Sequence, residues 1–470
     1  MPLRAVALAD FGSTYTKLSL VEPEEGRLLA RAEAPTSIDT DLMEGYVAAL
    51  ESARSALGTG VAVEREIAAS SAGGGLRVAA IGLVADLTAA AARQAALNAG
   101  ARVGTVLAGM LGDEQLDRLR TARPEIVLFA GGTDGGQSDL VVENARRLAS
   151  AGIEAHYVVA CNSEVAEAAA ALLRASGAPA EVAANVMPKL GAIQIDSARE
   201  AILRVFLDHV IGGKGLSASP EFGQMVRMPT PEAVLAAVGL LSRGTGSIPG
   251  VGDVMVVDVG GATTDVHSAR GIEAATPGIE ESLLPPPPRL RTVEGDLGLR
   301  SGAAGVLAAD GSWLEGESGL DDAALGQAVA FRSEDAKWVS EAPDQARLDD
   351  LLAIGCVAHA VRRHCGTMLL RRGEAGPPTL VRDGPDLREA AQVIGTGGVF
   401  AHRDDGREIL RAGLSRRASR SLSPRDPVLG VDASYVLAAA GLLAGDDADA
   451  AMRLLDRELV APGEPDTVTN

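Results

Sequence analysis

One pattern occurs twice in this chain and constrains its fold more than any other feature. It consists of an apolar strand that ends in aspartate, a turn rich in glycine and hydroxyl side chains, and a return strand. The first copy reads ALADFGSTYTK around Asp10, and the second reads MVVDVGGATTDV around Asp258. A second echo follows each copy, because VLAAVGLL at 234–241 recurs as VLAAAGLL at 436–443. A duplicated unit of this kind predicts two half-sites that face each other.

The first turn has the residue types that bind a nucleotide phosphate and its metal ion. Closely spaced backbone N–H groups and hydroxyls donate to phosphate oxygens, and a carboxylate suits a hydrated divalent ion. We expect Asp10 to face the metal, Gly12 to permit close backbone approach, and Lys17 to neutralise phosphate charge. The other expected donors of this turn are Ser13, Thr14 and Thr16.

The second turn repeats this arrangement. Asp258 takes the matching metal-side position in it. An ordinary β-hairpin with a polar turn explains either copy alone, but two copies at matching positions favour a phosphate clamp. The residues expected to bind phosphate in this turn are Gly260, Gly261, Ala262, Thr263 and Thr264.

The paired motifs resemble the phosphate-binding hairpins of the actin-like ATPase superfamily, which includes actin, heat-shock chaperones and sugar kinases. The resemblance implies an α/β protein with two RNase H-like halves around a cleft that binds ATP with Mg²⁺. We expect the first half at residues 1–247, with an α/β insertion at about 73–195, and the second half at 248–470. Two crossing helices form the hinge in this superfamily. The segments 230–244 and 430–445 resemble them, and their small residues would permit a close crossing.

The same resemblance implies two further parts of the site. Glu232 resembles the polar residue that places the attacking water, although an acid in the first turn of a helix is also favourable by itself. The string AQVIGTGGVFAH resembles the adenosine motif, a glycine turn after a strand against which the purine lies. Its expected binding residues are Gly395, Thr396, Gly397 and Gly398.

The chain as a whole resembles the MutL/GlmL family of glutamate mutase accessory proteins. The resemblance rests on DFGSTYTK from Asp10, IVLFAGGTDGG from Ile126, VVACNSEV from Val158, VGDVMVVDVGGATTDVHS from Val251 and RTVEGDLGLR from Arg291. It implies an ATP-binding, ATP-hydrolysing accessory protein that reactivates an adenosylcobalamin-dependent mutase. The sequence is also compatible with a homodimer.

Other functions on the same fold remain open. A small-molecule kinase needs a general base, for which Asp134 and Asp265 are candidates. The string VDVGGATTDV also resembles subunits of ATP-dependent hydantoinases, which cleave cyclic amides. A filament-forming actin-like protein is a third class.

The string DFGSTYTK also resembles a fourth group, the activators of 2-hydroxyacyl-CoA dehydratases. Those proteins hold an iron–sulfur cluster with cysteines. Cys356 and Cys365 are nine residues apart in one predicted helix at 348–372, which places them on opposite sides of it. This spacing argues against a cluster.

Residues 73–210 show the most regular alternation of strands and helices. Strands are predicted at 77–84, 125–130, 154–161 and 181–186, and helices at 139–150, 163–176 and 197–210. The glycine-rich turn AGGTDGGQSD at 130–139 has the form of a phosphate loop, but the two hairpins already account for the nucleotide. We therefore interpret it as a structural connection. A polyproline spacer is predicted at 285–288 and a solvated turn at 341–347.

Charge and composition exclude several classes of partner. Forty-three basic side chains against sixty-three acidic ones give a net charge of −20, and aromatic residues make up 3% of the chain. Without a polybasic tract, neither nucleic acid nor a membrane surface is an expected partner. The three cysteines suit a reducing compartment, and no apolar stretch approaches the roughly 18 residues of a membrane span. We expect a cytoplasmic protein.

Overall fold

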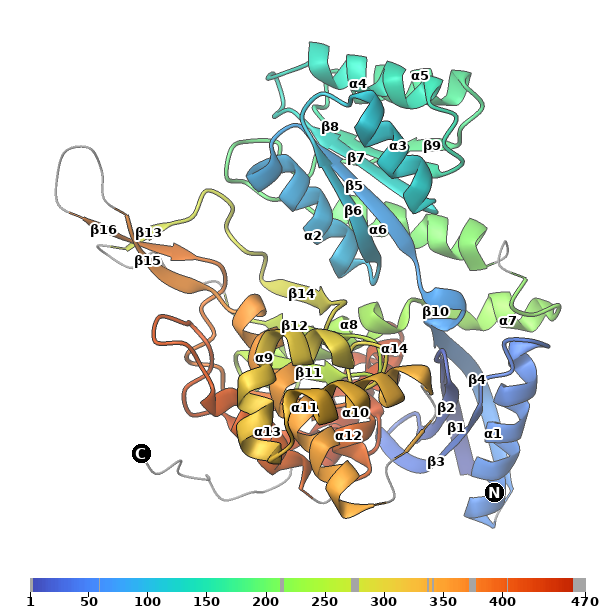
Figure 1. Ribbon diagram of the computed structural model, residues 1–470. Coiled ribbons are helices and arrows are strands. Elements are labelled where there is room, and N and C mark those ends of the chain that lie inside the picture. Colours follow the sequence, from blue (N-terminus) through green and yellow to red (C-terminus); the bar gives the residue numbers. More distant parts are fainter. Residues whose placement is uncertain are drawn as a thin grey trace. The chain divides into compact units, whose positions relative to one another are not determined.

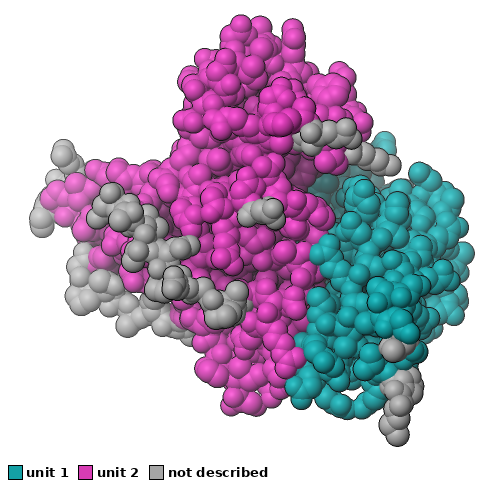
Figure 2. All heavy atoms as spheres, turned by 90° about the horizontal axis from the view of Figure 1, so that it is seen from below, with its two compact units in different colours: residues 1–236, 283–287, 441–447 teal, residues 237–282, 288–440, 448–470 magenta. Residues whose placement is uncertain are grey.

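The computed structural model describes residues 3–58, 60–211, 215–271, 279–335, 338–339, 342–371, 378–403 and 405–459 (Figure 1). The chain divides into two compact units. The first comprises residues 1–236, 283–287 and 441–447, and the second comprises residues 237–282, 288–440 and 448–470 (Figure 2). The expected boundary at 247 and 248 stays a prediction, because this division first falls at Ala236, inside a helix.

The first unit contains a five-stranded sheet in the order β10-β4-β1-β2-β3. Its first three strands form an antiparallel meander, and the other two continue the sheet in parallel. The central strand is buried along most of its length, as its nearly unbroken apolar run predicts. The strands are β1 (Leu3–Phe11), β2 (Tyr15–Glu22), β3 (Arg27–Pro35), β4 (Val61–Ser70) and β10 (Val226–Met228). Helix α1 (Leu42–Leu57) packs on this sheet, and Asp41 caps its first turn by accepting the N–H of Met43 at 2.9 Å.

The second unit repeats this sheet in the order β14-β12-β11-β17-β18. Its strands are β11 (Val254–Val259), β12 (Thr264–Ala269), β14 (Arg289–Glu294), β17 (Gln392–Thr396) and β18 (Val428–Val431). Three strands are again antiparallel and two are parallel, in the same positions. The repeated strand order confirms the expected fold class, with two RNase H-like halves of the actin-like type.

An insertion in the first unit forms a sheet of its own, in the order β6-β5-β7-β8-β9, with all strands parallel. Helices α2 and α6 cover one face, and α3, α4 and α5 cover the other (Figure 1). The strands are β5 (Arg77–Gly82), β6 (Arg102–Ala108), β7 (Ile126–Gly131), β8 (His156–Cys161) and β9 (Ala180–Val182). The helices are α2 (Ala90–Asn98), α3 (Asp113–Ala122), α4 (Asp139–Ser150), α5 (Ala166–Ala175) and α6 (Asp196–Val205).

The predicted elements of the insertion are all present, and most of them have shifted ends. The helix predicted at 139–150 matches α4, and the strand predicted at 181–186 shortens to β9 because Asn185 turns away to hydrogen-bond Gly132. The last predicted helix continues α6 into a π-helical turn, Phe206–Ile211, and its expected end at 212–213 lies outside the described residues. Strand β6 was not predicted, since its sequence mixes polar and apolar residues at the edge of the sheet.

Around its sheet the second unit has several helices and a small three-stranded sheet, β13-β16-β15. The helices are α9 (Ala303–Ser318), α10 (Asp322–Glu334), α11 (Pro343–His364), α12 (Gly398–Ala401), α13 (Gly406–Ser415) and α15 (Ala448–Leu459). The small strands are β13 (Ile279–Glu281), β15 (Thr367–Arg371) and β16 (Thr379–Asp383).

The helix predicted at 348–372 is wrong at both ends. Helix α11 begins at Pro343, because proline at the first helical position loses no hydrogen bond, so most of the predicted turn at 341–347 is helical. It ends at His364, and the backbone of Cys365 is extended. Gly366 then packs against Gly384, since a Cβ on Gly366 would lie 2.6 Å from the carbonyl carbon of Gly384. Strand β15 follows directly.

Helices α8 (Thr230–Arg243) and α14 (Val436–Ala444) carry the repeated VLAA strings, and a boundary between the units falls inside each of them. A Cβ on Gly441 of α14 would lie 1.8 Å from the carbonyl oxygen of Ala233 in α8, so the helices are in backbone contact there. Gly239 instead faces the side chain of Arg289. The predicted close crossing is thus confirmed at Gly441 and wrong at Gly239, and the predicted segment from 430 begins in β18 rather than in the helix.

Three further findings bear on the classes considered above. None of the helices in the described ranges has the length and apolar character needed to cross a membrane. Cys161, Cys356 and Cys365 are free and buried, and burial raises the pKa of each thiol. The described residues contain no cluster of three His, Cys, Asp or Glu side chains that could hold a metal ion.

Candidate functional site

The first predicted motif forms a hairpin between β1 and β2. Asp10 lies directly opposite Lys17 in the strand register, so their side chains share one face of the sheet. The N–H of Gly12 donates to the carbonyl oxygen of Tyr15 at 3.2 Å and closes the turn. A Cβ on Gly12 would lie 2.6 Å from that oxygen, so the turn requires glycine. Ser13 and Thr14 are exposed at its tip.

The second motif forms the same hairpin between β11 and β12. Asp258 lies opposite Asp265, and the N–H of Gly260 donates to the carbonyl oxygen of Thr263 at 2.9 Å. Gly261 and Ala262 are exposed at the tip, in the positions of Ser13 and Thr14. The two motifs therefore have the same local structure, as the sequence predicts.

Thr16 and Thr264 occupy matching positions, and both are fully buried. The hydroxyl of Thr16 is 3.3 Å from that of Thr36, which in turn donates to the carbonyl oxygen of Gly12 at 2.9 Å. The hydroxyl of Thr264 donates to the carbonyl oxygen of Leu297 at 3.0 Å. Both threonines brace their turns from the core side, which differs from the phosphate-donor role expected for them.

The predicted glycine turn after β17 lies against the second hairpin. β17 pairs with β11, and a Cβ on Gly397 would lie 2.4 Å from the carbonyl oxygen of Val259 and 3.0 Å from an Asp258 carboxylate oxygen. Gly397 also has a φ of 102°, which favours glycine. Only Gly397 and Gly398 of this set reach the surface.

The other two residues of that turn are buried and have structural contacts. Gly395 lies under the ring of Phe400, where a Cβ would be 2.9 Å from it. The hydroxyl of Thr396 donates to Asp432 at 3.4 Å. They shape the turn from inside.

Thr230, which the motif analysis missed, donates a hydrogen bond to an Asp10 carboxylate oxygen at 2.5 Å. Burial raises the pKa of Asp10, while Lys17 and the Thr230 hydroxyl act in the opposite direction. Thr230 begins helix α8, so its place at the start of the expected hinge helix was the available signal. The first turn of α8 is thereby tied to the first predicted metal-side carboxylate.

Glu232 lies in the first turn of the same helix and is buried. Its carboxylate forms an ion pair with Arg199 of α6. The position in the first turn of α8 matches the sequence prediction, and the Arg199 contact orients the side chain toward the insertion's last helix. A role in placing water stays a prediction.

The segment that follows β14 is a second contribution that the motif analysis did not assign. The N–H groups of Leu299 and Arg300 donate to the carbonyl oxygens of Gly260 at 3.0 Å and Gly261 at 2.7 Å. A Cβ on Gly302 would lie 2.5 Å from the carbonyl oxygen of Ala262. The backbone of this segment thus packs directly on the second turn, and the glycine spacing in EGDLGLRSG was the signal for it.

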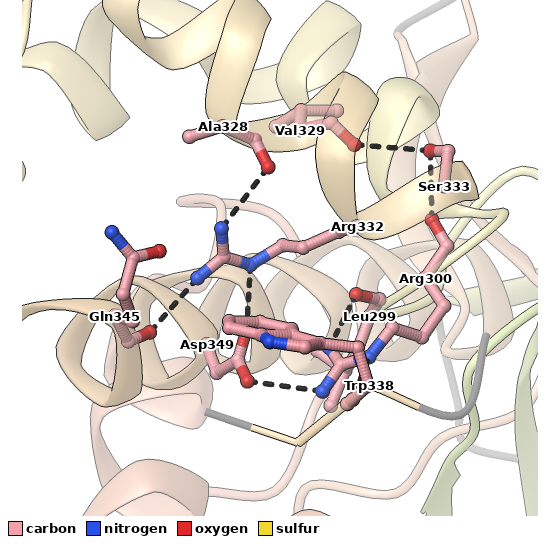
Figure 3. Close-up of polar contacts among 9 residues, drawn as sticks. All are labelled: Leu299, Arg300, Ala328, Val329, Arg332, Ser333, Trp338, Gln345 and Asp349. Carbon is pink, nitrogen blue, oxygen red and sulfur yellow. Dashed lines mark hydrogen bonds and ion pairs between the residues drawn. The ribbon is translucent and has the colours of Figure 1, made fainter. Parts of the chain in front are cut away.

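A buried charge cluster holds that segment in place (Figure 3). Asp349 of α11 accepts hydrogen bonds from Arg300 at 3.1 Å and from Arg332 of α10 at 2.7 Å. Arg332 is fully buried, and the carbonyl oxygens of Ala328 and Gln345 each accept a hydrogen bond from one of its two terminal nitrogens. The ring of Trp338 lies 5.4 Å from the Arg300 guanidinium and 5.1 Å from that of Arg332. The cluster therefore anchors the second turn to helices α10 and α11.

The two candidate bases of the kinase alternative have other partners. Asp265 forms an ion pair with the buried Arg291 at 2.6 Å. Asp134 accepts hydrogen bonds at 2.9 Å from Asn185 and from the N–H of Ser163. Burial raises the pKa of Asp134, but these hydrogen bonds outweigh burial and hold it below its usual value. Both carboxylates join neighbouring segments of the fold.

Comparisons with known proteins agree with the family resemblance. The family described as MutL protein matches residues 6–459. The chain is 39% identical to "Protein MutL" of Clostridium tetanomorphum over 459 residues, which cover 97% of this chain and 99% of that protein.

Among solved structures, a glycerol dehydratase reactivase is 11% identical to this chain with a TM-score of 0.33. The match covers 94% of this chain and 99% of the reactivase chain. A ROK family glucokinase from Streptomyces griseus, in complex with glucose and AMPPNP, is 14% identical to this chain with a TM-score of 0.32. That match covers 93% of this chain and 98% of the glucokinase chain. The fold assignment rests on the repeated strand order rather than on these two structures. The family match and the near end-to-end identity show that the chain belongs to the MutL protein family.

Proposed function

We propose that this protein binds and hydrolyses Mg-ATP and uses the cycle to reactivate an adenosylcobalamin-dependent mutase, either glutamate mutase or a related aminomutase. The observation that carries the proposal is the pair of hairpins with the same closed turn and an aspartate at the same position. Membership of the MutL family supports the mutase as partner. The proposal extends to a cytoplasmic protein, which the free thiols support.

The residues at the two turns fit a magnesium nucleotide. In the described chain, the N–H groups of Ser13 and Thr14, and those of Gly261 and Ala262, donate to no other backbone group. Such donors in a tight turn suit phosphate oxygens. We propose that Asp10 and Asp258 hold Mg²⁺ through its waters, since carboxylate oxygens are the ligands this ion prefers. The ion would neutralise charge on the phosphates, and Gly397 and Gly398 would receive the purine.

The proposed hinge helices begin beside residues that are tied to the first hairpin, for α8, and to the glycine turn after β17, for α14. These contacts support coupling between nucleotide and hinge. Helix α8 begins at Thr230, which is bonded to Asp10. Helix α14 is capped by Asp432, which accepts the N–H groups of Val436 at 2.8 Å and Leu437 at 3.2 Å. Asp432 also accepts from Thr396, at the end of the strand that carries the glycine turn. A change at the first hairpin, or at the glycine turn after β17, would therefore reach the start of one of these helices.

The cycle would work by differential affinity. A mutase that holds damaged cofactor should bind one nucleotide state more tightly than the other, and about 1.4 kcal/mol of difference corresponds to each tenfold change in affinity. The net charge of −20 predicts that the contact weakens with salt where the mutase presents basic residues.

The deciding experiment mixes inactivated mutase with free adenosylcobalamin and Mg-ATP, and adds wild-type protein, Asp258→Ala protein, or none. We expect recovery with the wild type alone, because the variant lacks a metal-side carboxylate. Calorimetry on Asp10→Ala and Asp258→Ala should show lost Mg-ATP binding in folded proteins. Equal recovery in all three arms would remove the reactivation function.

Phosphorylation or cyclic-amide cleavage in place of recovery would promote the kinase or the hydantoinase alternative. The engagement of Asp134 and Asp265 in structural contacts gives no support to a kinase base at either position. Wild-type ATP hydrolysis by both alanine variants would overturn the assignment of the metal site.

A further inference from the structure

The glycine turn after β17 continues into α12, a single helical turn that its own backbone closes. The N–H groups of Phe400 and Ala401 each donate to the carbonyl oxygen of Gly397 at 3.0 Å, and that of His402 donates to Gly398 at 3.2 Å. These bonds make the glycine turn and α12 one unit. A helix of four residues is not stable by itself, so the position of this unit depends on its neighbours.

Core packing fixes the middle of this unit. The ring of Phe400 lies against Gly395 of β17, as described above. Gly406, the first residue of α13, packs on the other side of Phe400, where a Cβ would lie 3.0 Å from the Phe400 carbonyl oxygen. These contacts hold the buried side of the turn, and the end of the turn needs a further contact.

Arg403 comes directly after this unit and supplies that contact. Its Nη2 donates to an Asp350 carboxylate oxygen at 2.9 Å. Its Nε and Nη2 also donate to Asp405, at 2.8 Å and 2.9 Å. Asp405 belongs to the same short segment, whereas Asp350 lies on α11, 53 residues away in the sequence. Asp350 is therefore the charged contact that joins the end of the glycine turn to another helix.

The preceding residue on α11, Asp349, holds the phosphate part of the proposed site in this unit. It accepts a hydrogen bond from Arg300, whose backbone N–H donates to Gly261 of the second turn. Two adjacent carboxylates of one helix thus reach the phosphate turn through Arg300 and the glycine turn through Arg403. Helix α11 has 22 residues and packs in the core of the second unit, so it provides a rigid frame between the two turns.

We propose that Asp350 is a positioning residue for the purine, because through Arg403 it holds the turn of Gly397 and Gly398 in the place that the base requires. This inference rests on the proposed function, in which that turn receives the purine of Mg-ATP. Asp350 acts through Arg403 and needs no contact with the nucleotide. Loss of the ion pair should weaken the binding of the base and leave the phosphate turn, which Asp349 holds, unchanged.

The charges around Asp350 make this contact dependent on pH. Burial raises the pKa of Asp350 to about 6. Asp405, from the segment before α13, and Asp349, on α11, also raise this pKa, whereas Arg403 and Arg347 lower it. The Oδ1 atom of Asp350 is buried and accepts no hydrogen bond from the described part of the chain. The charge that holds Arg403 is therefore present above about pH 6 and is lost as the pH falls through that value.

The test is calorimetry on the full-length protein with Mg-ATP and with magnesium tripolyphosphate, which has no base. At about pH 7.5 we expect Asp350→Asn and Arg403→Gln each to weaken Mg-ATP binding by about fivefold, the size that a partly exposed ion pair can contribute. Both should bind tripolyphosphate as the wild type does, and Arg403→Gln carries the test if Asp350→Asn does not fold. Asp310→Asn is the matched control, because Asp310 forms a similarly buried pair with Arg416 at the other end of α13. It should leave the binding of both ligands unchanged.

The same measurement at lower pH separates positioning from a structural role. The ratio of wild-type to Asp350→Asn affinity for Mg-ATP should approach one as the pH falls through about 6, because wild-type Asp350 is then also neutral. A ratio that does not change with pH, wild-type Mg-ATP affinity in both pair variants, an equal loss for tripolyphosphate, or an equal loss in Asp310→Asn would each overturn the inference. Those outcomes keep the proposed function, whereas a wild-type protein that binds no Mg-ATP would remove the function and this inference with it.

Discussion

The contact between Gly441 and Ala233 predicts opposite effects for the same substitution in helices α8 and α14. In Gly441→Ala, the added Cβ would lie 1.8 Å from the Ala233 carbonyl oxygen and 2.5 Å from its carbonyl carbon. Both are backbone atoms, so the helices must separate by roughly 1.2 Å to reach even a 3.0 Å contact. In Gly239→Ala, the Cβ meets the flexible side chain of Arg289 at 2.7 Å, which can move aside.

The magnitudes follow from two opposing terms. Alanine in place of glycine stabilises a helix interior by about 1 kcal/mol. Overpacking at a site that cannot relax costs about 1 to 3 kcal/mol, and the short backbone contact at Gly441 places it at the upper end. We therefore expect Gly441→Ala to lower the free energy of unfolding by about 1 to 2 kcal/mol, and Gly239→Ala to leave it unchanged or raise it by up to about 1 kcal/mol.

Urea unfolding followed by circular dichroism measures both values, and the melting temperature of Gly441→Ala should fall by about 2 to 8 °C. ATP turnover serves as a second measurement, because a displaced crossing should also disturb the hinge. If Gly441→Ala is as stable as Gly239→Ala and turns over ATP at the wild-type rate, the helices do not cross in backbone contact at Ala233.

Three other predictions concern a hydrogen bond, a buried ion pair and a buried histidine. Thr230→Val removes a hydrogen bond that lowers the pKa of Asp10, so the pKa of Asp10 should rise further. The acid limb of the ATPase pH profile should then move up by as much as about one pH unit, and Thr230→Ser should restore it. Asp349→Asn leaves the buried Arg332 without its counter-charge, so it should lower the free energy of unfolding in urea by about 3 to 5 kcal/mol. The control is Glu280→Gln, which breaks an exposed ion pair with Arg371 and should lower it by less than about 1 kcal/mol. Burial, together with the nearby His267, lowers the pKa of His364 to about 3, so protons bind the unfolded chain preferentially and stability should fall as pH drops from about 6.5 toward 3. His364→Gln should flatten that slope, and an unchanged slope would show that His364 is not buried in its neutral form.

The local structure of the site was predictable from the sequence because neighbouring residues determine it. The turn after Asp10 needs glycine at Gly12, and the turn after Asp258 leaves little room for a side chain at Gly260. Both turns close by hydrogen bonds within four residues. Four of the insertion's five strands and three of its five helices were predictable for the same reason, since their apolar periodicity is a local property. The edge strand β6 and the ends of α11 were harder to predict from the sequence. Residues that are neighbours in space, but not in sequence, decide where strand pairing starts and where a helix ends.

Contacts between distant segments depended on the tertiary structure. The sequence lists Thr16 and Thr264 as polar residues beside phosphate-type turns, but strand pairing directs both hydroxyls into the core. Thr230 reaches Asp10 across 220 residues because β10 lies beside β4 in the sheet, which sets the start of α8 near the end of β1. Gly239 and Gly441 are equivalent in the repeated strings, yet only Gly441 lies against a backbone. Residue type and spacing determine which turns can form, whereas the packing of whole elements determines which side chains meet.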